Sequence, residues 1–114
     1  MKITRIEPIH VSIPFVHGAP APTEGLGAQG LLDILFVRVD TDAGVTGWGE
    51  AFGHAATPVT IAALTRVIAP LATGRDPTDI TGLMGDLWFR TKGMSRNGPV
   101  AFALSGLDIA LWDI

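Results

Sequence analysis

The stretch VAFALSGLDIALWDI, residues 100–114, has the apolar spacing of an amphipathic helix. Its apolar residues recur at intervals of three and four, which places them on one face of a helix. These residues are Val100, Ala103, Leu104, Leu107, Leu111 and Ile114. Asn97, Gly98 and Pro99 come just before, and a capping side chain or a permissive glycine followed by a proline is typical of a helix start. We therefore predict a helix that begins near Pro99.

The far end of this stretch carries no signal that the helix should stop. No Gly, Asn or Pro follows the last apolar position, and Asp113 lies unfavourably near the negative end of the helix dipole. Ile109 and Trp112 make the remaining faces apolar as well, so one small sheet cannot cover this helix. We expect the chain to be the first domain of a longer protein, with a further surface packed on this helix.

Composition supports that expectation. The chain has 114 residues, 47% of them hydrophobic and only 17% charged, against a usual charged share of about 25%. A small well-packed protein, or one half of a homodimer, is the alternative interpretation. The absence of cysteine excludes disulfides and thiolate metal sites.

The charge balance and the apolar runs narrow the choice of partners. The net charge is −3 and the basic residues form no stripe, which argues against nucleic acid. No apolar run reaches the roughly 18 residues of a membrane span, and the first residues do not form a signal-peptide core. We expect a soluble cytoplasmic protein that binds a small molecule or another protein surface.

Strand patterns fill the first half of the chain. Residues 6–14 alternate through Ile9, Val11 and Ile13, which are expected to form the apolar inner face while His10 is exposed. Ile6 is out of phase with them, as a bulge or an edge position would allow. Residues 31–52 read as two strands joined by a turn at residues 42–44, which is typical of a hairpin.

Helix patterns follow the strands. Thr57-Pro58 is expected to open one helix, which Pro70 ends or bends. Residues 76–77, Asp-Pro, are expected to open a second helix that Gly93 stops. Strands followed by helices predict an α+β fold, with a three-stranded antiparallel meander and then about three helices.

Three segments together resemble a known family: VTGWGEA (residues 45–51), APLATGRDP (residues 69–77) and SGLDIALWDI (residues 105–114). They are similar to the amino-terminal capping domain of the mandelate racemase and muconate lactonizing enzyme group of the enolase superfamily. The resemblance covers all 114 residues. Its most specific positions are Ser105, Gly106, Asp108, Ala110, Leu111, Asp113 and Ile114.

The resemblance implies a division of labour between two domains. Residues 1–114 would be the capping domain with the start of the linker helix, and a (β/α)8 barrel would follow. Such enzymes, which are isomerases or lyases, use Mg²⁺ and a Lys or His base to remove the proton α to a carboxylate. The parent would be a racemase, epimerase or acid dehydratase, with a cycloisomerase as the alternative. Its partners would be a small carboxylate substrate, its own barrel and further copies of itself.

No catalytic residue and no metal ligand are expected in this segment. Asp108 and Asp113 project about 140° apart on a helix, so they cannot share one ion. Asp108 is expected to make a polar contact at the domain junction, because a carboxylate on so apolar a helix needs a partner. Gly106 costs about 1 kcal/mol relative to Ala in a helix and suggests a close backbone approach.

Two loops are the candidate substrate contacts. Residues 14–30 form a glycine-rich connection longer than usual, which is typical of a lid. Its candidate side chains are Phe15, His17, Glu24 and Leu26. Residues 51–58 form the second loop, with His54 as the candidate. A solvated loop histidine is the equal alternative for His17 and His54.

Two other functions stay open. A free-standing binding module would use the same lid and apolar helix to hold a ligand or a protein. A small acid–base enzyme would use His17 or His54 with Glu24, but neither histidine has an oriented partner at motif spacing.

Overall fold

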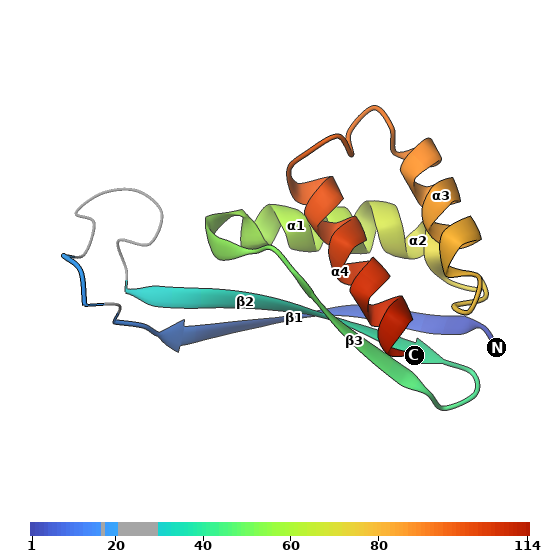
Figure 1. Ribbon diagram of the computed structural model, residues 1–114, viewed down its shortest axis with the longest axis horizontal. Helices are drawn as coiled ribbons and strands as arrows, with labels where there is room; N and C mark the ends of the chain where they lie inside the picture. The colour runs from blue at the N-terminus through green and yellow to red at the C-terminus, as the bar shows by residue number, and fades with distance from the viewer. Residues whose placement is uncertain (17, 21–29) are drawn as a thin grey trace.

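The computed structural model describes residues 1–16, 18–20 and 30–114. It has two layers, a three-stranded antiparallel sheet in the order β1-β2-β3 and a set of helices on one of its faces (Figure 1). The strands are β1 (Ile3–Pro14), β2 (Leu31–Thr41) and β3 (Thr46–Ala51). The predicted α+β fold, a meander followed by helices, is confirmed.

The hairpin of β2 and β3 follows the pattern that the sequence predicts. Leu35, Val37 and Val39 of β2 are fully buried and alternate with half-buried residues, as predicted. At the turn, the Thr41 hydroxyl accepts from the Val45 N–H at 3.1 Å and donates to the Val45 carbonyl at 2.8 Å. This pair of bonds closes the turn and sets the register of the two strands.

The predicted inner face of β1 is wrong. The register pairs Ile6 with Val39 and His10 with Leu35, so these β1 side chains lie on the face that the helices cover. Ile9, Val11 and Ile13 therefore point to the opposite face. From Arg5 to Pro14 the pairing is regular, and the one register shift, between Ile3 and Arg5, brings buried Ile3 onto the helix side together with Ile6. His10 is nevertheless exposed, as predicted.

The first helical region contains a widened turn. It runs through α1 (Thr57–Ala63), the π-helical η2 (Leu64–Ile68) and α2 (Ala69–Ala72). Pro70 has no N–H and its ring would clash with a carbonyl four residues earlier, and a π turn relieves both problems. The helix ends two residues after Pro70, in line with the prediction that this proline ends or bends it.

The second helix, α3 (Ile80–Arg90), begins later than expected. Its N-cap is Asp79, whose carboxylate accepts from the Gly82 N–H at 3.2 Å. Asp76 instead accepts from the N–H and the hydroxyl of Thr78, at 2.9 and 2.7 Å, and so forms a local turn. The helix also ends at Arg90, before Gly93, and the Thr91 hydroxyl donates to the Leu87 carbonyl at 2.8 Å.

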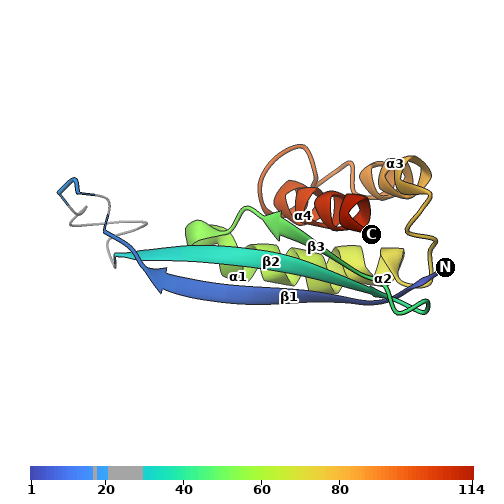
Figure 2. The same ribbon diagram turned by 60° about the horizontal axis from the view of Figure 1, so that its bottom comes forward.

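The last helix, α4 (Pro99–Asp113), lies over β3 (Figures 1 and 2). Gly98 is its N-cap with φ of 81°, a backbone conformation that favours glycine, and no side chain caps the helix. The predicted stripe is buried at its centre. Ala103, Leu104, Leu107 and Leu111 are at most 2% exposed. Together with the inner face of β2 and the η2 region, this stripe forms the core.

Candidate functional site

The contact between α4 and β3, which we call the seam, is made by backbone rather than by interlocking side chains. It consists of Gly47 and Gly49 on β3, facing Gly106 and Ala110 on α4. A Cβ atom on Gly49 would lie 2.1 Å from the Gly106 carbonyl oxygen, and one on Gly47 would lie 2.1 Å from the Ala110 carbonyl oxygen. The helix therefore rests directly on the strand, and glycine is required on the strand side.

Gly106 is required on the helix side of the seam. A Cβ atom there would lie 2.7 Å from both the Ala51 Cβ and the Val37 Cγ2. The prediction that Gly106 permits a close backbone approach is confirmed. The Trp-Gly-Glu and Ser-Gly-Leu-Asp segments thus meet each other in space, and together they dock the last helix.

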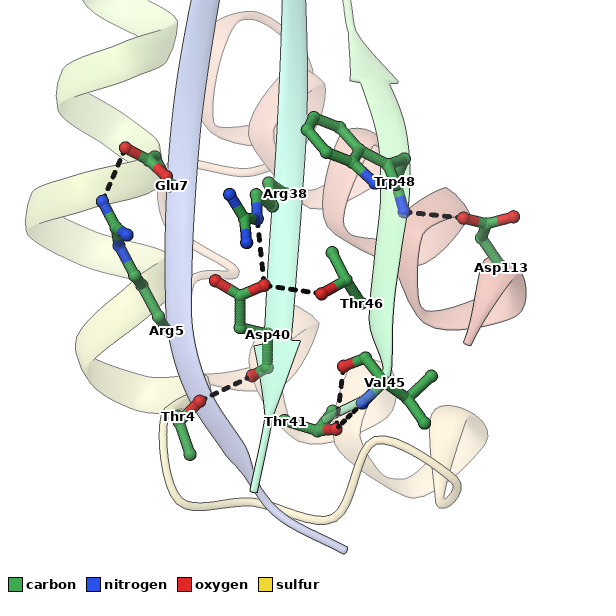
Figure 3. A network of polar contacts seen from close by, with 10 residues as sticks. All are labelled: Thr4, Arg5, Glu7, Arg38, Asp40, Thr41, Val45, Thr46, Trp48 and Asp113. Atoms are coloured by element: carbon green, nitrogen blue, oxygen red, sulfur yellow. Dashed lines mark hydrogen bonds and ion pairs between the residues drawn. The ribbon is translucent and has the colours of Figure 1, made fainter. Parts of the chain in front are cut away.

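Asp113 closes the end of the seam (Figure 3). Its Oδ2 accepts a hydrogen bond from the Trp48 backbone N–H at 2.8 Å. β3 is an edge strand, and this N–H would otherwise be left without a partner in the sheet. The bond offsets the unfavourable position of a carboxylate at a helix C-terminus, and sequence reasoning did not find it.

Asp108 lies on a different side of α4 and is half-buried. Within the described part of the chain it makes no hydrogen bond and no ion pair. Its expected contact at a domain junction stays a prediction.

The first predicted loop lies between the end of β1 and the start of β2. The Phe15 N–H donates to the Gly30 carbonyl at 2.8 Å, which closes the base of the loop. The Phe15 side chain is 46% exposed. His17, Glu24 and Leu26 lie outside the described residues.

The second predicted loop follows β3 and holds His54 in an unusual backbone conformation. His54 has φ of 44°, and among the described residues it is the only non-glycine with a positive φ. Such a conformation costs about 1–2 kcal/mol, and strained residues of this kind cluster at functional sites. The Thr57 hydroxyl donates to the His54 carbonyl at 2.6 Å and helps hold the turn.

A row of aromatic rings extends from His54 to α4. The centroids of His54 and Phe52 lie 4.9 Å apart, and those of Phe52 and Phe102 lie 4.7 Å apart. Phe52 is 53% exposed although its ring contacts both of the others in a tilted arrangement. Sequence reasoning missed Phe52 and Phe102; the signal available was that Phe52 stands in the same loop as His54, beside Gly53.

A polar cluster lies near this row, on the same face of the sheet. The Asp33 carboxylate of β2 accepts from the Ser12 hydroxyl and lies 2.9 Å from His10 Nε2, both on β1. These two hydrogen bonds, that from Ser12 first, and the charges of His10 and His54 lower the pKa of Asp33 below its usual value. Phe15, the aromatic row and this Asp33 cluster make up what we call the loop end of the sheet.

Other carboxylates are paired within the fold. Asp40 bonds to Thr46 and Arg38, which lower its pKa, and Asp86 bonds to Arg75 and Arg90 with the same effect. Over residues 1–16, 18–20 and 30–114, no group of three or more His, Cys, Asp or Glu residues is placed to hold a metal ion. In the same ranges no helix is both long and apolar enough to cross a membrane.

The fold and the seam define an amino-terminal capping domain of the enolase superfamily. Residues 25–114 match the family described as mandelate racemase / muconate lactonizing enzyme, N-terminal domain, and the chain belongs to this family. The predicted family is thus confirmed.

Curated and solved relatives agree with this assignment. A D-galactonate dehydratase of Ralstonia pickettii (strain 12J) is 40% identical over 85 residues, which are 70% of this chain and 20% of the relative. A putative isomerase from Sinorhizobium meliloti superimposes with a TM-score of 0.85 at 27% identity, over 98% of this chain and 33% of that one. The chain therefore spans about a fifth to a third of the length of these relatives.

Two further solved structures are similar to this chain, one named for its reaction and one determined with magnesium. The 3,6-anhydro-D-galactonate cycloisomerase from Zobellia galactanivorans gives a TM-score of 0.78 at 27% identity, over 99% of this chain and 28% of its own. A mandelate racemase/muconate lactonizing protein from Paracoccus denitrificans PD1222, complexed with magnesium, gives 0.73 at 27% identity, over 97% and 26%.

Proposed function

We propose that this chain is the substrate-specificity and lid domain of a Mg²⁺-dependent enzyme that removes the proton α to a carboxylate. The observation that carries this proposal is the loop end of the sheet. A strained histidine with an exposed aromatic row follows β3, and the base of a long loop lies at the same end of the sheet, in a domain whose family caps a larger enzyme.

The loop end has the chemistry of a specificity surface rather than of a reaction centre. Phe52 and Phe102 offer apolar ring faces with His54 beside them, and Phe15 offers a further exposed ring at the base of the first loop. Such groups select among substrates by contact with the part remote from the reacting carbon. Of the proposed contacts, His17, Glu24 and Leu26 stay predictions.

The carboxylates that the structure describes do not fit a magnesium site. Mg²⁺ needs several oxygen ligands converging on one point, whereas Asp113 is bonded to β3 and Asp33, Asp40 and Asp86 each have partners in separate places. We therefore assign the metal and the bases to the remainder of the enzyme, the proposed (β/α)8 barrel. The chain itself would bind, orient and shield the substrate.

An acid dehydratase, which is a lyase, is the reaction class that the relatives favour over a racemase. The support is the 40% identity to the D-galactonate dehydratase of R. pickettii. A cycloisomerase is the second candidate, because the Zobellia structure aligns over 99% of this chain. Product analysis after incubation with polyhydroxy acids separates them, since a dehydratase yields a 2-keto-3-deoxy acid and a cycloisomerase conserves the atoms of its substrate.

The test uses the whole enzyme with single substitutions at the loop end. His54→Ala and Phe15→Ala are assayed on two acids that differ only at the end remote from the carboxylate. The α-proton exchange rate in deuterated solvent is measured in parallel. Phe89→Ala is the matched control, because Phe89 is 68% exposed on α3, away from the loop end.

We expect kcat/KM to fall unequally on the two acids, by roughly tenfold more on one of them, since each apolar contact is worth about 1–3 kcal/mol of discrimination. The exchange of the α-proton and the Phe89→Ala enzyme should change little. Equal losses on both acids would contradict the proposal, because the domain would then support the barrel without selecting its substrate. Full activity of the chain on its own would contradict the assignment of the metal and the bases to the remainder of the enzyme.

Location in the cytoplasm and assembly with further copies also stay proposals.

A further inference from the structure

Both hydrogen bonds that the structure describes at the Asp33 carboxylate end on the same oxygen. This oxygen, Oδ1, accepts from the Ser12 hydroxyl and lies 2.9 Å from His10 Nε2. Within residues 1–16, 18–20 and 30–114, Oδ2 takes no hydrogen bond. In the same part of the chain no side-chain oxygen is buried without a partner, and the Asp33 side chain is 27% exposed. Oδ2 is therefore an acceptor that a ligand can reach.

The two donors on β1 fix the direction of this carboxylate. Ser12 lies opposite Asp33 in the register, and His10 lies opposite Leu35, two residues further along β2. Because Leu35 is fully buried under the helical layer, these side chains all lie on the helix side of the sheet. The bonds from Ser12 and His10, in that order, lower the pKa of Asp33. The carboxyl group is thus ionised at neutral pH and can only accept hydrogen bonds.

The aromatic row lies beside this carboxylate. Gly53 rests on β2, since a Cβ atom on it would lie 3.5 Å from the Leu35 Cβ. Asp33 is two residues from Leu35, about 7 Å along an extended strand. His54 and the exposed Phe52 flank Gly53 in the chain, and the charge of His54 acts on Asp33. A fixed acceptor and an exposed ring are therefore within reach of one small ligand.

An ionised acceptor beside an apolar ring suits the end of a molecule that carries a hydroxyl group. The hydroxyl donates to Oδ2, and the neighbouring C–H groups pack on the ring. A methyl end gives Oδ2 no donor, and the charge of Asp33 repels a second carboxylate. An ammonium end is the rival ligand, but the charges of His10 and His54 beside Asp33 oppose it.

We propose that Asp33 determines the specificity of the loop end, because its Oδ2 accepts from a hydroxyl group at the end of the substrate remote from the reacting carboxylate. This inference rests on the proposed function, in which the loop end contacts that remote part of the substrate. Asp33 admits an acid that ends in a hydroxyl group and rejects the corresponding diacid.

The test is the affinity of the whole enzyme with Mg²⁺ for three acids, measured by isothermal titration calorimetry. The acids have the same configuration and differ only at the remote end, which is a hydroxymethyl group, a methyl group or a second carboxylate. They are a 3-deoxyhexonic, a 3,6-dideoxyhexonic and a 3-deoxyhexaric acid. None has a 3-hydroxyl group, so elimination cannot consume them during the titration. The α-proton exchange of the same acids is measured in deuterated solvent.

Asp33→Asn and Asp33→Glu separate the charge of this residue from its geometry. Asp86→Asn is the matched control, because it removes an equal charge from an Asp on α3 that also bonds to two side chains. Each comparison is a ratio of two affinities on one preparation. A variant that is partly unfolded therefore lowers the number of sites without changing the ratio.

We expect the wild type to bind the hydroxyl acid about tenfold or more tightly than either of the other acids, as a hydrogen bond to a charged group does. Asp33→Asn should lower the preference over the diacid at least about tenfold, because an amide in this place can donate to a carboxylate. Asp33→Glu should still reject the diacid but lose most of the preference over the methyl acid. Asp86→Asn should leave both ratios unchanged.

Three results would overturn the inference: no binding of any of the acids, ratios that Asp33→Asn leaves unchanged, or tighter binding of the matching 6-amino acid. Equal weakening of all three acids is such an unchanged ratio, and it is expected if Asp33 only ties β1 to β2. The exchange assay separates this inference from the proposed function. Shifted ratios without α-proton exchange in the wild type contradict the proposed reaction and retain Asp33 as a binding residue. Exchange with unchanged ratios retains the reaction and removes Asp33 from specificity.

Discussion

The two ends of β3 are built in opposite ways. Between Gly47 and Gly49 the strand contacts α4 so closely that one methyl group has no room. A few residues later, at His54, the backbone adopts a strained conformation and the neighbouring Phe52 ring is 53% exposed. The seam is rigid and closed, whereas the loop end is exposed and open to contacts.

This difference explains what the sequence signature of the domain encodes. Gly106, Ala110 and Asp113 carry the resemblance to the family, and in the structure they dock α4 on β3. Residues that are proposed to touch substrate, such as His54 and Phe15, lie outside that signature. The signature residues of this domain therefore reflect how α4 packs on β3. Residues that determine substrate specificity must be sought outside the signature.

The largest expected effect is at the seam. Gly49→Ala places a methyl group 2.1 Å from the Gly106 carbonyl oxygen, and neither backbone can move without displacing α4. We expect the free energy of unfolding to fall by about 3 kcal/mol or more, at the upper end of overpacking effects. Urea denaturation followed by circular dichroism measures it.

Gly85→Ala is the control for that substitution. Gly85 lies within α3 and a Cβ atom there meets nothing within 4 Å. The same Gly-to-Ala change should stabilise the protein by up to about 1 kcal/mol through helix propensity. If Gly49→Ala were as stable as the wild type, α4 would not rest on β3 as described, and the rigid half of the comparison would fail.

The fold was largely predictable because its patterns are local. The alternation of Leu35, Val37 and Val39 and the stripe on α4 both survive in the structure. The inner face of β1 was not predictable, because both faces of the sheet are apolar, and the alternation of Ile9, Val11 and Ile13 does not tell which face the helices cover. The sequence also did not show that Asp79, and not Asp76, caps α3. Two Asp residues three positions apart each suit either a turn or a helix cap.

The candidate site was predictable only in outline. Sequence placed His54 and Phe15 in loops, and the structure puts both loops at the same end of the sheet. The ring contact between Phe52 and Phe102 joins residues about 50 positions apart, and the hydrogen bond from the Trp48 N–H to Asp113 joins residues about 65 positions apart. No periodicity reports such contacts, because they depend on how α4 crosses β3.

A smaller effect is expected where the seam ends. Asp113→Ala leaves the Trp48 N–H of the edge strand without its acceptor but also removes a negative charge from a helix C-terminus. We expect a net loss of about 1 kcal/mol in the free energy of unfolding. Asp108→Ala is the matched control on the same helix and should cost less than half as much. Equal effects of the two substitutions would show that the bond to Trp48 adds nothing.

The smallest effect is expected at the loop end, and it depends on pH. The hydrogen bonds from Ser12 and His10 lower the pKa of Asp33 in the folded protein below the ordinary value of 3.8. A carboxyl group whose pKa is lowered by folding stabilises the protein above the ordinary pKa, and this contribution disappears as the pH falls through the lowered value. Asp33→Asn should therefore reduce the urea midpoint at about pH 6, and the gap to the wild type should close as the pH approaches about 2. The effect is small because the carboxylate is solvent-exposed.

The other acidic residues titrate in both proteins, so their contributions cancel in the difference between the two midpoints. Ser12→Ala should remove most of the pH dependence of the gap, since its hydrogen bond is the first cause of the lowered pKa. If the gap stayed constant from about pH 6 to about pH 2, the Asp33 cluster would have no electrostatic role, and the loop end would differ from the seam only in its packing.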